Sequence, residues 1–214
     1  DSLDGWSGSD TMEGGDGNDT YYVNIAGDVV IETNADSVTG GVDTVYTMLS
    51  DYTLGANVEN GVLYTSSAVN LTGNSLNNVL TSNAGNNVMD GSAGIDTVSY
   101  ATATSSVTAT LASTASQNTG GSGLDTLINI ENLTGSAYND SLTGSSADNV
   151  LTGGSGDDVL DGLTGNDTLD GGAGLDTASY ANASSAVNVL LYSTAAPQTT
   201  GGAGSDTLLN IENL

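Results

Sequence analysis

Carboxylates are the only charged side chains in this sequence, and their spacing suits metal binding. The chain has 214 residues, with 26 Asp and Glu residues and no Lys, Arg or His, which gives a formal net charge of -26. Acidic pairs recur 18 residues apart, at Asp1 and Asp19, Asp10 and Asp28, Asp140 and Asp158, and Asp158 and Asp176. Calcium prefers oxygen ligands such as carboxylates. Because the chain has no basic side chain to offset its charge, repulsion opposes folding, and we expect several calcium ions (Ca2+) to supply positive charge.

The missing residue types exclude most other chemistry. Without His there is no Ser-His-Asp triad or HExxH zinc motif, and without Lys there is no Schiff base. The absence of Cys removes disulfides, and the absence of basic residues argues against nucleic acids and anionic membrane surfaces. No stretch is apolar for long enough to insert into a membrane. A glycosidase-type carboxylate pair is the one catalytic option left, but 26 acidic residues give no means of selecting one. We therefore expect no enzyme activity and no catalytic residues.

A nine-residue repeat positions these acids. From Gly135 the chain reads GSAYNDSLT, GSSADNVLT, GGSGDDVLD, GLTGNDTLD and GGAGLDTAS without a gap. The eighth position of each unit is apolar, at Leu142, Leu151, Leu160, Leu169 and Ala178. The sixth position carries the candidate ligand, at Asp140, Asn149, Asp158, Asp167 and Asp176. A strict period of this kind indicates a repeat architecture.

The pattern G-G-x-G-x-D recurs in full at five places. These are Gly14–Asp19, Gly120–Asp125, Gly153–Asp158, Gly171–Asp176 and Gly201–Asp206. On these residues the chain resembles the RTX (repeat-in-toxin) family of type I secreted bacterial proteins, whose nonapeptide is G-G-x-G-x-D-x-U-x with U a large apolar residue. The resemblance implies an all-β parallel β-roll, or β-solenoid, with calcium between successive turns. It also implies an extracellular or cell-surface location in a bacterium.

Nine residues can form one tight turn and one short strand. Glycines permit positive φ, so six residues can turn while their carbonyls point inward, and the remaining three form a minimal strand. Two units return the chain to the same side, so sixth-position residues 18 apart should lie in adjacent layers. Asp158 should then serve two ions while Asp157 points outward. Asn149 with Asp167, and Asn78 with Asp96, should be weaker sites because an amide oxygen carries no charge.

The predicted metal-binding residues are the sixth-position side chains and the glycines of three full repeats. They are Asp1, Asp10, Asp19, Asp28, Asp96, Asp125, Asp140, Asn149, Asp158, Asp167, Asp176 and Asp206, with Gly14, Gly15, Gly17, Gly153, Gly154, Gly156, Gly171, Gly172 and Gly174. The competing interpretation is ordinary Asp-Gly and Asn-Gly turn chemistry without metal. The other acidic residues are expected on a solvated face, among them Asp16, Asp90, Asp148, Asp157, Asp161 and Asp170.

A longer repeat overlies the short one. GLDTLINIENL at Gly123–Leu133 returns as GSDTLLNIENL at Gly204–Leu214, and the segments before them contain VTATL and VNVLL, whose alternation predicts strands. The predicted segments are residues 1–31, RTX β-roll repeats; 32–72, an irregular β-strand connector; 73–99, degenerate RTX repeats; 100–134, a β-strand insertion with one RTX turn; 135–179, RTX β-roll repeats; and 180–214, a second copy of the insertion.

Three functions fit these features. The first is a calcium-binding structural segment of an adhesin, surface-layer or filament protein, which two long repeat units and the lack of positive charge favour. The second is the accessory C-terminal RTX domain of a secreted protease, lipase or epimerase whose catalytic part lies elsewhere. The third is an ice-binding solenoid, which the varied turn residues disfavour. Other copies or adjoining repeats of the same protein are the expected partners, with a cell-surface or matrix partner as an alternative. Because both ends fall within repeats, we expect an internal piece of a longer array.

Overall fold

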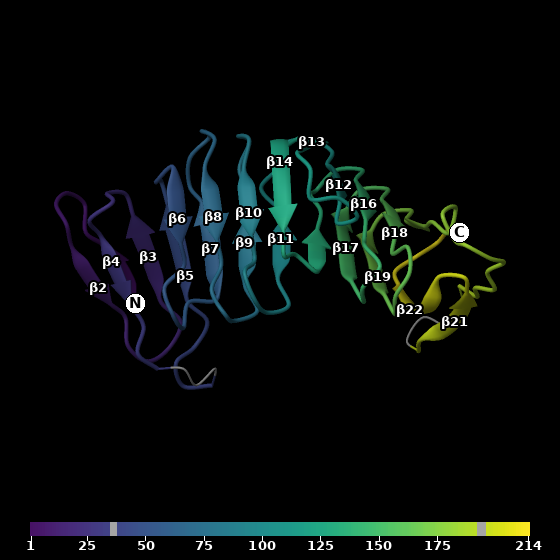
Figure 1. The fold of residues 1–214 in the computed structure, drawn as a ribbon, viewed down its shortest axis with the longest axis horizontal. Coiled ribbons are helices and arrows are strands. Elements are labelled where there is room, and N and C mark those ends of the chain that lie inside the picture. Colours follow the sequence, from purple (N-terminus) through teal and green to yellow (C-terminus); the bar gives the residue numbers. More distant parts are fainter. Residues whose placement is uncertain (35–37, 192–195) are drawn as a thin grey trace.

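The fold is a solenoid of short β-strands. The computed structural model describes residues 1–34, 38–191 and 196–214, and its regular secondary structure in these ranges is entirely β. Figure 1 shows the strands side by side along the long axis, with the two termini towards opposite ends. The all-β parallel β-roll predicted from the repeats is confirmed. The described residues contain no helix long and apolar enough to span a membrane.

One face of the solenoid is a single sheet of eleven strands. In spatial order these are β1 (Ser2–Asp4), β3 (Thr20–Val23), β5 (Thr44–Thr47), β7 (Asn60–Leu63), β9 (Val79–Thr81), β11 (Thr97–Ser99), β15 (Asn132–Thr134), β17 (Val150–Ser155), β19 (Thr168–Ala173), β22 (Gly204–Leu209) and β21 (Gln198–Gly201). Neighbouring strands are parallel, except for the hairpin of β21 and β22. Parallel pairing follows from the repeat, because the chain crosses to the other face between successive strands.

The opposite face is divided into three sheets. They comprise β2 (Thr11–Glu13) with β4 (Val29–Ile31); β6 (Asp51–Thr53), β8 (Asn70–Thr72), β10 (Val88–Asp90), β14 (Gly123–Ile128) and β13 (Gln117–Gly120); and β12 (Thr108–Thr110), β16 (Ser141–Thr143), β18 (Val159–Asp161) and β20 (Thr177–Ala178). Only the hairpin of β13 and β14 is antiparallel among these pairs. The interruptions fall where longer segments replace the nine-residue unit.

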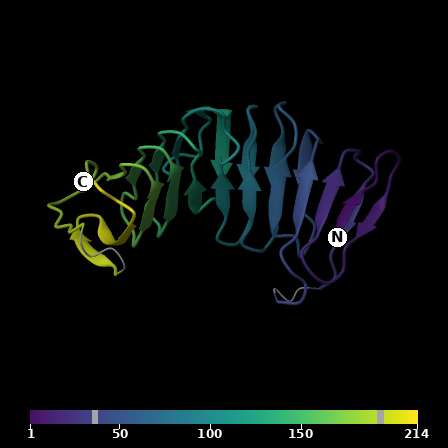
Figure 2. The same cartoon turned by 180° about the vertical axis from the view of Figure 1, so that it is seen from behind.

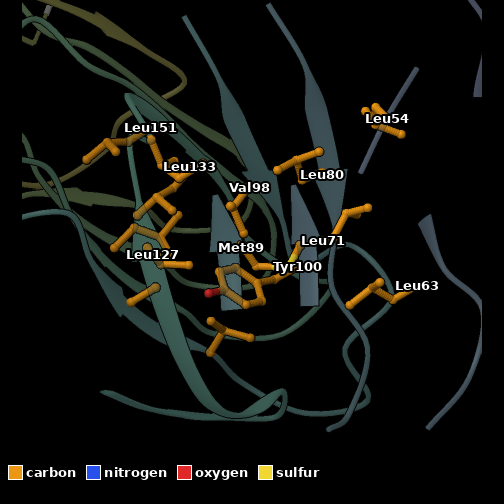
Figure 3. Packing of buried hydrophobic residues seen from close by; sticks show 14 of the residues in the cluster. Leu54, Leu63, Leu71, Leu80, Met89, Val98, Tyr100, Leu127, Leu133 and Leu151 are labelled. Atoms are coloured by element: carbon orange, nitrogen blue, oxygen red, sulfur yellow. The ribbon is translucent and has the colours of Figure 1, made fainter. Parts of the chain in front are cut away.

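The core is a double column of apolar side chains between the two faces. Leu133, Leu151, Leu169 and Leu208 are paired in register on neighbouring strands of the eleven-stranded sheet, and all are buried. Figure 3 shows the middle of this core, where Leu71, Leu80 and Met89 lie close to Val98 and Tyr100. The predicted eighth-position residues, from Leu142 to Ala178, are buried as expected.

Gly61 is the exception within the column. It pairs with Val45 on one side and Leu80 on the other, at a place where its neighbours carry large side chains. A side chain there would collide with Leu71 and Leu54, whose methyl groups lie 2.9–3.2 Å from the position of its first carbon. The opposite face therefore fills the space that Gly61 leaves.

The two inserted segments differ in structure. VTATL forms β12, which pairs with β16 in the next layer, as predicted. VNVLL, residues 187–191, was also predicted as a strand, but it has no strand structure. The physical reason is pairing, since no strand of the described residues lies beside VNVLL in the way that β16 lies beside β12. An isolated three-residue strand has no stability of its own.

Three tyrosines form a row on the outer side of the eleven-stranded sheet. The rings of Tyr22 and Tyr46 are stacked with centroids 5.2 Å apart, and Tyr64 meets Tyr46 edge-on at 5.6 Å. The three rings come from successive layers: Tyr22 lies in β3, Tyr46 lies in β5, and Tyr64 directly follows β7. Such aromatic pairs add about 0.5–1.5 kcal/mol beyond their buried area. The row therefore stabilises the stacking of these layers from outside the core.

Candidate metal sites

The residue that precedes most strands, or that occupies the equivalent place within β14 and β22, forms a row along each long edge of the solenoid. Figures 1 and 2 show the turns that carry these rows stacked from layer to layer. We call the row before the eleven-stranded sheet the first ladder: Asp1, Asp19, Asp43, Glu59, Asn78, Asp96, Glu131, Asn149, Asp167 and Asp206. The second ladder precedes the opposite strands: Asp10, Asp28, Asn87, Asp125, Asp140, Asp158, Asp176 and Glu212. Ser50, Val69 and Val107 occupy the remaining places of the second ladder.

After Asp1 and Asp10, which begin the two ladders, one oxygen of each ladder carboxylate accepts a hydrogen bond from the backbone of the layer before it. The amide of Asp140 donates to Asp158 Oδ1 at 2.7 Å, and the amide of Asp158 donates to Asp176 Oδ1 at 2.8 Å. The amide of Asp167 donates likewise to Asp206 Oδ1 at 3.0 Å. These bonds place each carboxylate between two turns, as the spacing of 18 residues predicted for Asp158 and Asp176.

The second oxygen is buried without a hydrogen-bond partner at six of the predicted positions. Within the described residues these atoms are Oδ2 of Asp10, Asp19, Asp96, Asp158, Asp167 and Asp176. A buried carboxylate oxygen without a partner is costly. Each such oxygen therefore requires a cation or a proton.

The first-position glycine leaves open the space beside this oxygen. At Gly153, a side chain would overlap Asp158 Oδ2, and its first carbon would lie 2.6 Å from the carbonyl oxygen of Gly171 in the next layer. At Gly154 and Gly156 the backbone has φ values of +110° and +111°, which favour glycine. Carboxylate and carbonyl oxygens thus converge on one space, and this set of hard donors fits calcium.

Burial raises the pKa of several ladder carboxyls. Desolvation raises the pKa of Asp158 to about 6, and the charges of Asp140, Asp176 and Asp157 add to the effect. The pKa of Asp167 rises to about 7, again chiefly through burial and then through nearby carboxylates such as Asp206. The amide hydrogen bonds act in the opposite direction and are outweighed. Negative charge at these sites is therefore disfavoured unless a cation accompanies it.

Comparison with known families agrees with this geometry. The family model described as the RTX calcium-binding nonapeptide repeat matches in four copies, at residues 1–21, 70–98, 129–160 and 143–178. The chain contains RTX calcium-binding repeats. A search of curated proteins found no match. The RTX matches contain all six sixth-position carboxylates whose second oxygen is buried without a partner.

Four predicted ligands differ, because both of their oxygens accept hydrogen bonds. Asp28 Oδ2 accepts from the amides of Asn24 and Ile25 at 3.2 and 3.1 Å, and its Oδ1 accepts from the amide of Asp10 at 3.2 Å. Asp140 accepts from the amide of Val107 at Oδ1 and from the amide of Ser136 at Oδ2. Asp125 and Asp206 complete this group and have a different turn. Asp1 differs from the other predicted ligands because it is exposed to solvent. Calcium binding by these residues stays a prediction.

The RTX consensus at Gly120–Asp125 and Gly201–Asp206 forms hairpins instead of solenoid turns. Each hairpin joins two antiparallel strands, β13 to β14 and β21 to β22. The hydroxyl of Thr119 lies 3.1 Å from Asp125 Oδ2, and that of Thr200 lies 3.3 Å from Asp206 Oδ2. Neither segment is part of a family match. A full consensus therefore does not guarantee the solenoid turn.

Where the ladder residue is Asn, its side-chain NH2 group donates hydrogen bonds to backbone carbonyls, which an Asp carboxylate cannot do. The amide group of Asn149 donates to the carbonyl of Glu131 at 2.6 Å, and its Oδ1 accepts from the amide of Ser145 at 2.7 Å. Asn78 and Asn87 donate in the same way to carbonyls of the preceding layer, at 2.9–3.1 Å. The prediction that Asn149 binds calcium is untested, but its hydrogen bonds favour a turn complete without metal.

The predicted glycines take three places in their RTX turns. The first position, beside the sixth-position side chain, is held by Gly14, Gly153 and Gly171. The second and fourth positions have positive φ and are held by Gly15, Gly154, Gly172, Gly17, Gly156 and Gly174. These glycines shape the space around the carboxylates. Trp6 and Leu163 have positive φ at the second position without glycine, at +59° and +69°, whereas Ser136 and Ser145 at the same position do not.

Four acidic members of the ladders were missed by the sequence argument. Asp43, Glu59, Glu131 and Glu212 each accept an amide of the neighbouring layer at 2.8–2.9 Å. Their spacing to the previous member is not 18, so the period alone could not find them. The usable signal is local: an acid, then Thr or Asn, then a core position. Glu131 ends the turn of three residues between β14 and β15. Its side chain is longer than that of Asp, and it reaches the amide of Asp96 from this short turn.

The prediction that acidic residues outside the sixth position are exposed to solvent is correct for Asp148 and Asp157 and wrong for Asp161. Asp157 and Asp148 are exposed, and each also accepts an amide of the next layer, from Leu175 at 3.0 Å and from Asn166 at 2.7 Å. Asp161 is instead 8% exposed. The segment after β20 covers it, and Asn182 donates to its Oδ2 at 2.8 Å.

Proposed function

We propose that this chain is a calcium-loaded structural segment of a secreted or cell-surface bacterial protein, of the adhesin, surface-layer or filament type. The observation that carries the proposal is the pair of carboxylate ladders, with six buried oxygens lacking a partner in the described residues. The sequence has no basic side chain to neutralise them. Bound calcium would join successive layers and make the solenoid rigid.

A structural role is supported by how the acidic residues are used. The ladder carboxylates accept hydrogen bonds from backbone amides of adjacent turns, and these bonds hold neighbouring layers together. The sequence lacks His, Lys, Arg and Cys, which supply most general bases and nucleophiles. The calcium-binding repeat therefore accounts for the acidic residues without a catalytic role.

Folding after type I secretion fits the expected calcium affinity. Calcium modules outside cells bind with Kd values of about 10⁻⁴–10⁻³ M. A chain with net charge -26 would stay unfolded where calcium is scarce and fold where it is abundant. Because each layer pairs with the next, adjoining repeats or other copies of this protein are the partners that the architecture suits.

Circular dichroism with and without a calcium chelator tests the proposal. The expected result is loss of β structure on chelation and its recovery when calcium is restored. A spectrum that chelation leaves unchanged would contradict a calcium-dependent scaffold. The mass of the natural secreted polypeptide then separates two roles. A very large repetitive chain supports the scaffold, whereas a chain of ordinary enzyme size with a catalytic domain would make this segment an accessory domain.

A further inference from the structure

Glu32 breaks the pattern of the RTX turn. It follows β4 directly, at the place where glycine follows β2 as Gly14. At Gly14 a side chain would overlap the hydroxyl of Tyr21 and meet the carboxylate of Asp19. One layer further on, the chain has a charged side chain at this place, and it is only 7% exposed. The interval to the next ladder residue, Asp43, is eleven residues instead of the usual five.

Glu32 adds a third carboxylate to two members of the first ladder. One oxygen each from Asp19, Glu32 and Asp43 lie within 4.8 Å of one another. Asp19 is 2% exposed and Asp43 is 1% exposed, so the whole group is buried. A group of three carboxylates in so small a space is strongly self-repelling unless a cation or protons are present.

Two oxygens of this group have no hydrogen-bond partner. They are Glu32 Oε2 and Asp19 Oδ2, both buried. The rest of Glu32 is held in place: the Tyr21 hydroxyl donates to its Oε1, and the side chain of Asn57 donates to its carbonyl at 3.0 Å. The protein thus fixes the carboxylate of Glu32 and leaves one oxygen without a protein donor.

The surroundings provide little positive charge. The amino group of Asp1 contacts Asp19 Oδ1, which is the other oxygen of that carboxylate. Glu59 lies next along the ladder and accepts the amide of Asp43 at 2.8 Å, so it adds negative charge. The whole sequence contains no Lys, Arg or His.

We infer that Asp19, Glu32 and Asp43 bind one calcium ion through their carboxylates, with Glu32 as a ligand that the RTX nonapeptide does not provide. The inference rests on the proposed function, since it takes calcium as the available cation. Calcium affinity rises with the number of charged ligands and the rigidity of the site. This site has three carboxylates, so it binds the tightest calcium ion of the chain. It joins the turn before β3 to the turn before β5.

Calcium titration calorimetry of the Glu32→Gln variant tests the site. Gln keeps the shape and the hydrogen bond from Tyr21 but removes the charge. The expected result is one ion fewer per chain, with the tightest phase lost or weakened by at least about tenfold. Glu13→Gln, at the exposed end of β2, removes the same charge elsewhere and should leave the tightest phase intact.

Unfolding measurements keep the test valid if binding is hard to resolve. In chelator, Glu32→Gln should be at least as stable as the parent, because repulsion is relieved. In calcium it should be less stable, because a ligand is gone. Equal ion number and equal affinity in the parent and in Glu32→Gln would overturn this site and leave the proposed function standing. No calcium binding by the parent chain would overturn both.

Discussion

Two regions of the solenoid share the RTX turn but complete it differently. The amide region, residues 73–90, has Asn78 and Asn87 at the sixth position. The carboxylate region, residues 153–178, has Asp158, Asp167 and Asp176. In the amide region the side-chain NH2 group donates to carbonyls of the preceding layer. In the carboxylate region each Oδ2 is buried without a partner.

This difference identifies what calcium contributes. An amide supplies its own hydrogen-bond donors and carries no charge, so the turn needs no cation. Asn78 Oδ1 accepts from the amide of Asn74 at 2.7 Å, whereas Asn87 Oδ1 is buried without a partner. A carboxylate brings negative charge and no donor, so the equivalent turn needs a cation. Both regions match the same family model. The dependence on calcium should therefore vary along one continuous fold, according to a single side chain in each turn.

Removing one carboxylate should have the largest effect in the carboxylate region. Asp158→Ala deletes a group that accepts the Asp140 amide and leaves that buried donor unpaired. We expect a loss of about 3 kcal/mol or more in the free energy of unfolding in calcium, together with weaker calcium binding. Asp157→Ala removes an exposed acceptor of the Leu175 amide and should cost only about 1 kcal/mol. Equal effects in chemical unfolding and calorimetric titration would mean that the assigned register is wrong.

Exchanging the two turn types should move the calcium dependence with the side chain. Asp158→Asn should stabilise the calcium-free fold by about 1–3 kcal/mol, because charge is removed and an amide donor is gained. Asn87→Asp should destabilise the calcium-free fold by a similar amount, because the carbonyl of Val69 loses its donor. Asn86→Asp is the matched control, since Asn86 is exposed and accepts the Leu124 amide through an oxygen that Asp retains. If Asn87→Asp and Asn86→Asp behave alike in chelator, the sixth position has no special role.

The pH dependence of stability should reverse its direction when calcium is bound. Asp158 and Asp167 have folded pKa values of about 6 and about 7, above the unfolded value of about 3.9. The calcium-free fold therefore binds extra protons, so its stability is full below about pH 4 and falls as pH rises through 6–7. Calcium must displace these protons, so its affinity should fall by up to about tenfold per pH unit below pH 6. Melting curves at several pH values, with and without calcium, measure both slopes, and slopes of the same sign would contradict this account.

The sequence predicts the regular turns because their geometry is periodic. The interval of 18 residues is enough to place Asp158 beside Asp176. It could not identify Asp43 or Glu59, since their layers have connections of other lengths. The hairpin at Gly120–Asp125 has the full consensus, and only pairing with β13 distinguishes it from a solenoid turn. The role of Asn87 was also hidden, because an amide is both a possible ligand and a donor until its neighbours are known.

Burial of the remaining side chains depends on packing between distant segments. Asp161 ends a strand and has the same sequence context as Asp170, yet Asp161 is buried and Asp170 is partly exposed. The segment containing Asn182 covers Asp161, and the sequence around Asp161 does not predict this contact. Glu32 is a further example, because its partners Asp19 and Tyr21 come from the previous layer.

Hydrogen exchange measured by mass spectrometry tests the central claim most directly, since it reports on both regions in one molecule. We expect chelation to remove most amide protection from residues 153–178, while residues 73–90 lose less. Restoring calcium should return protection to residues 153–178 first at the amides of Asp158 and Thr177, which bond across adjacent layers. Equal protection of residues 153–178 with and without calcium would contradict the claim that calcium completes the carboxylate turns.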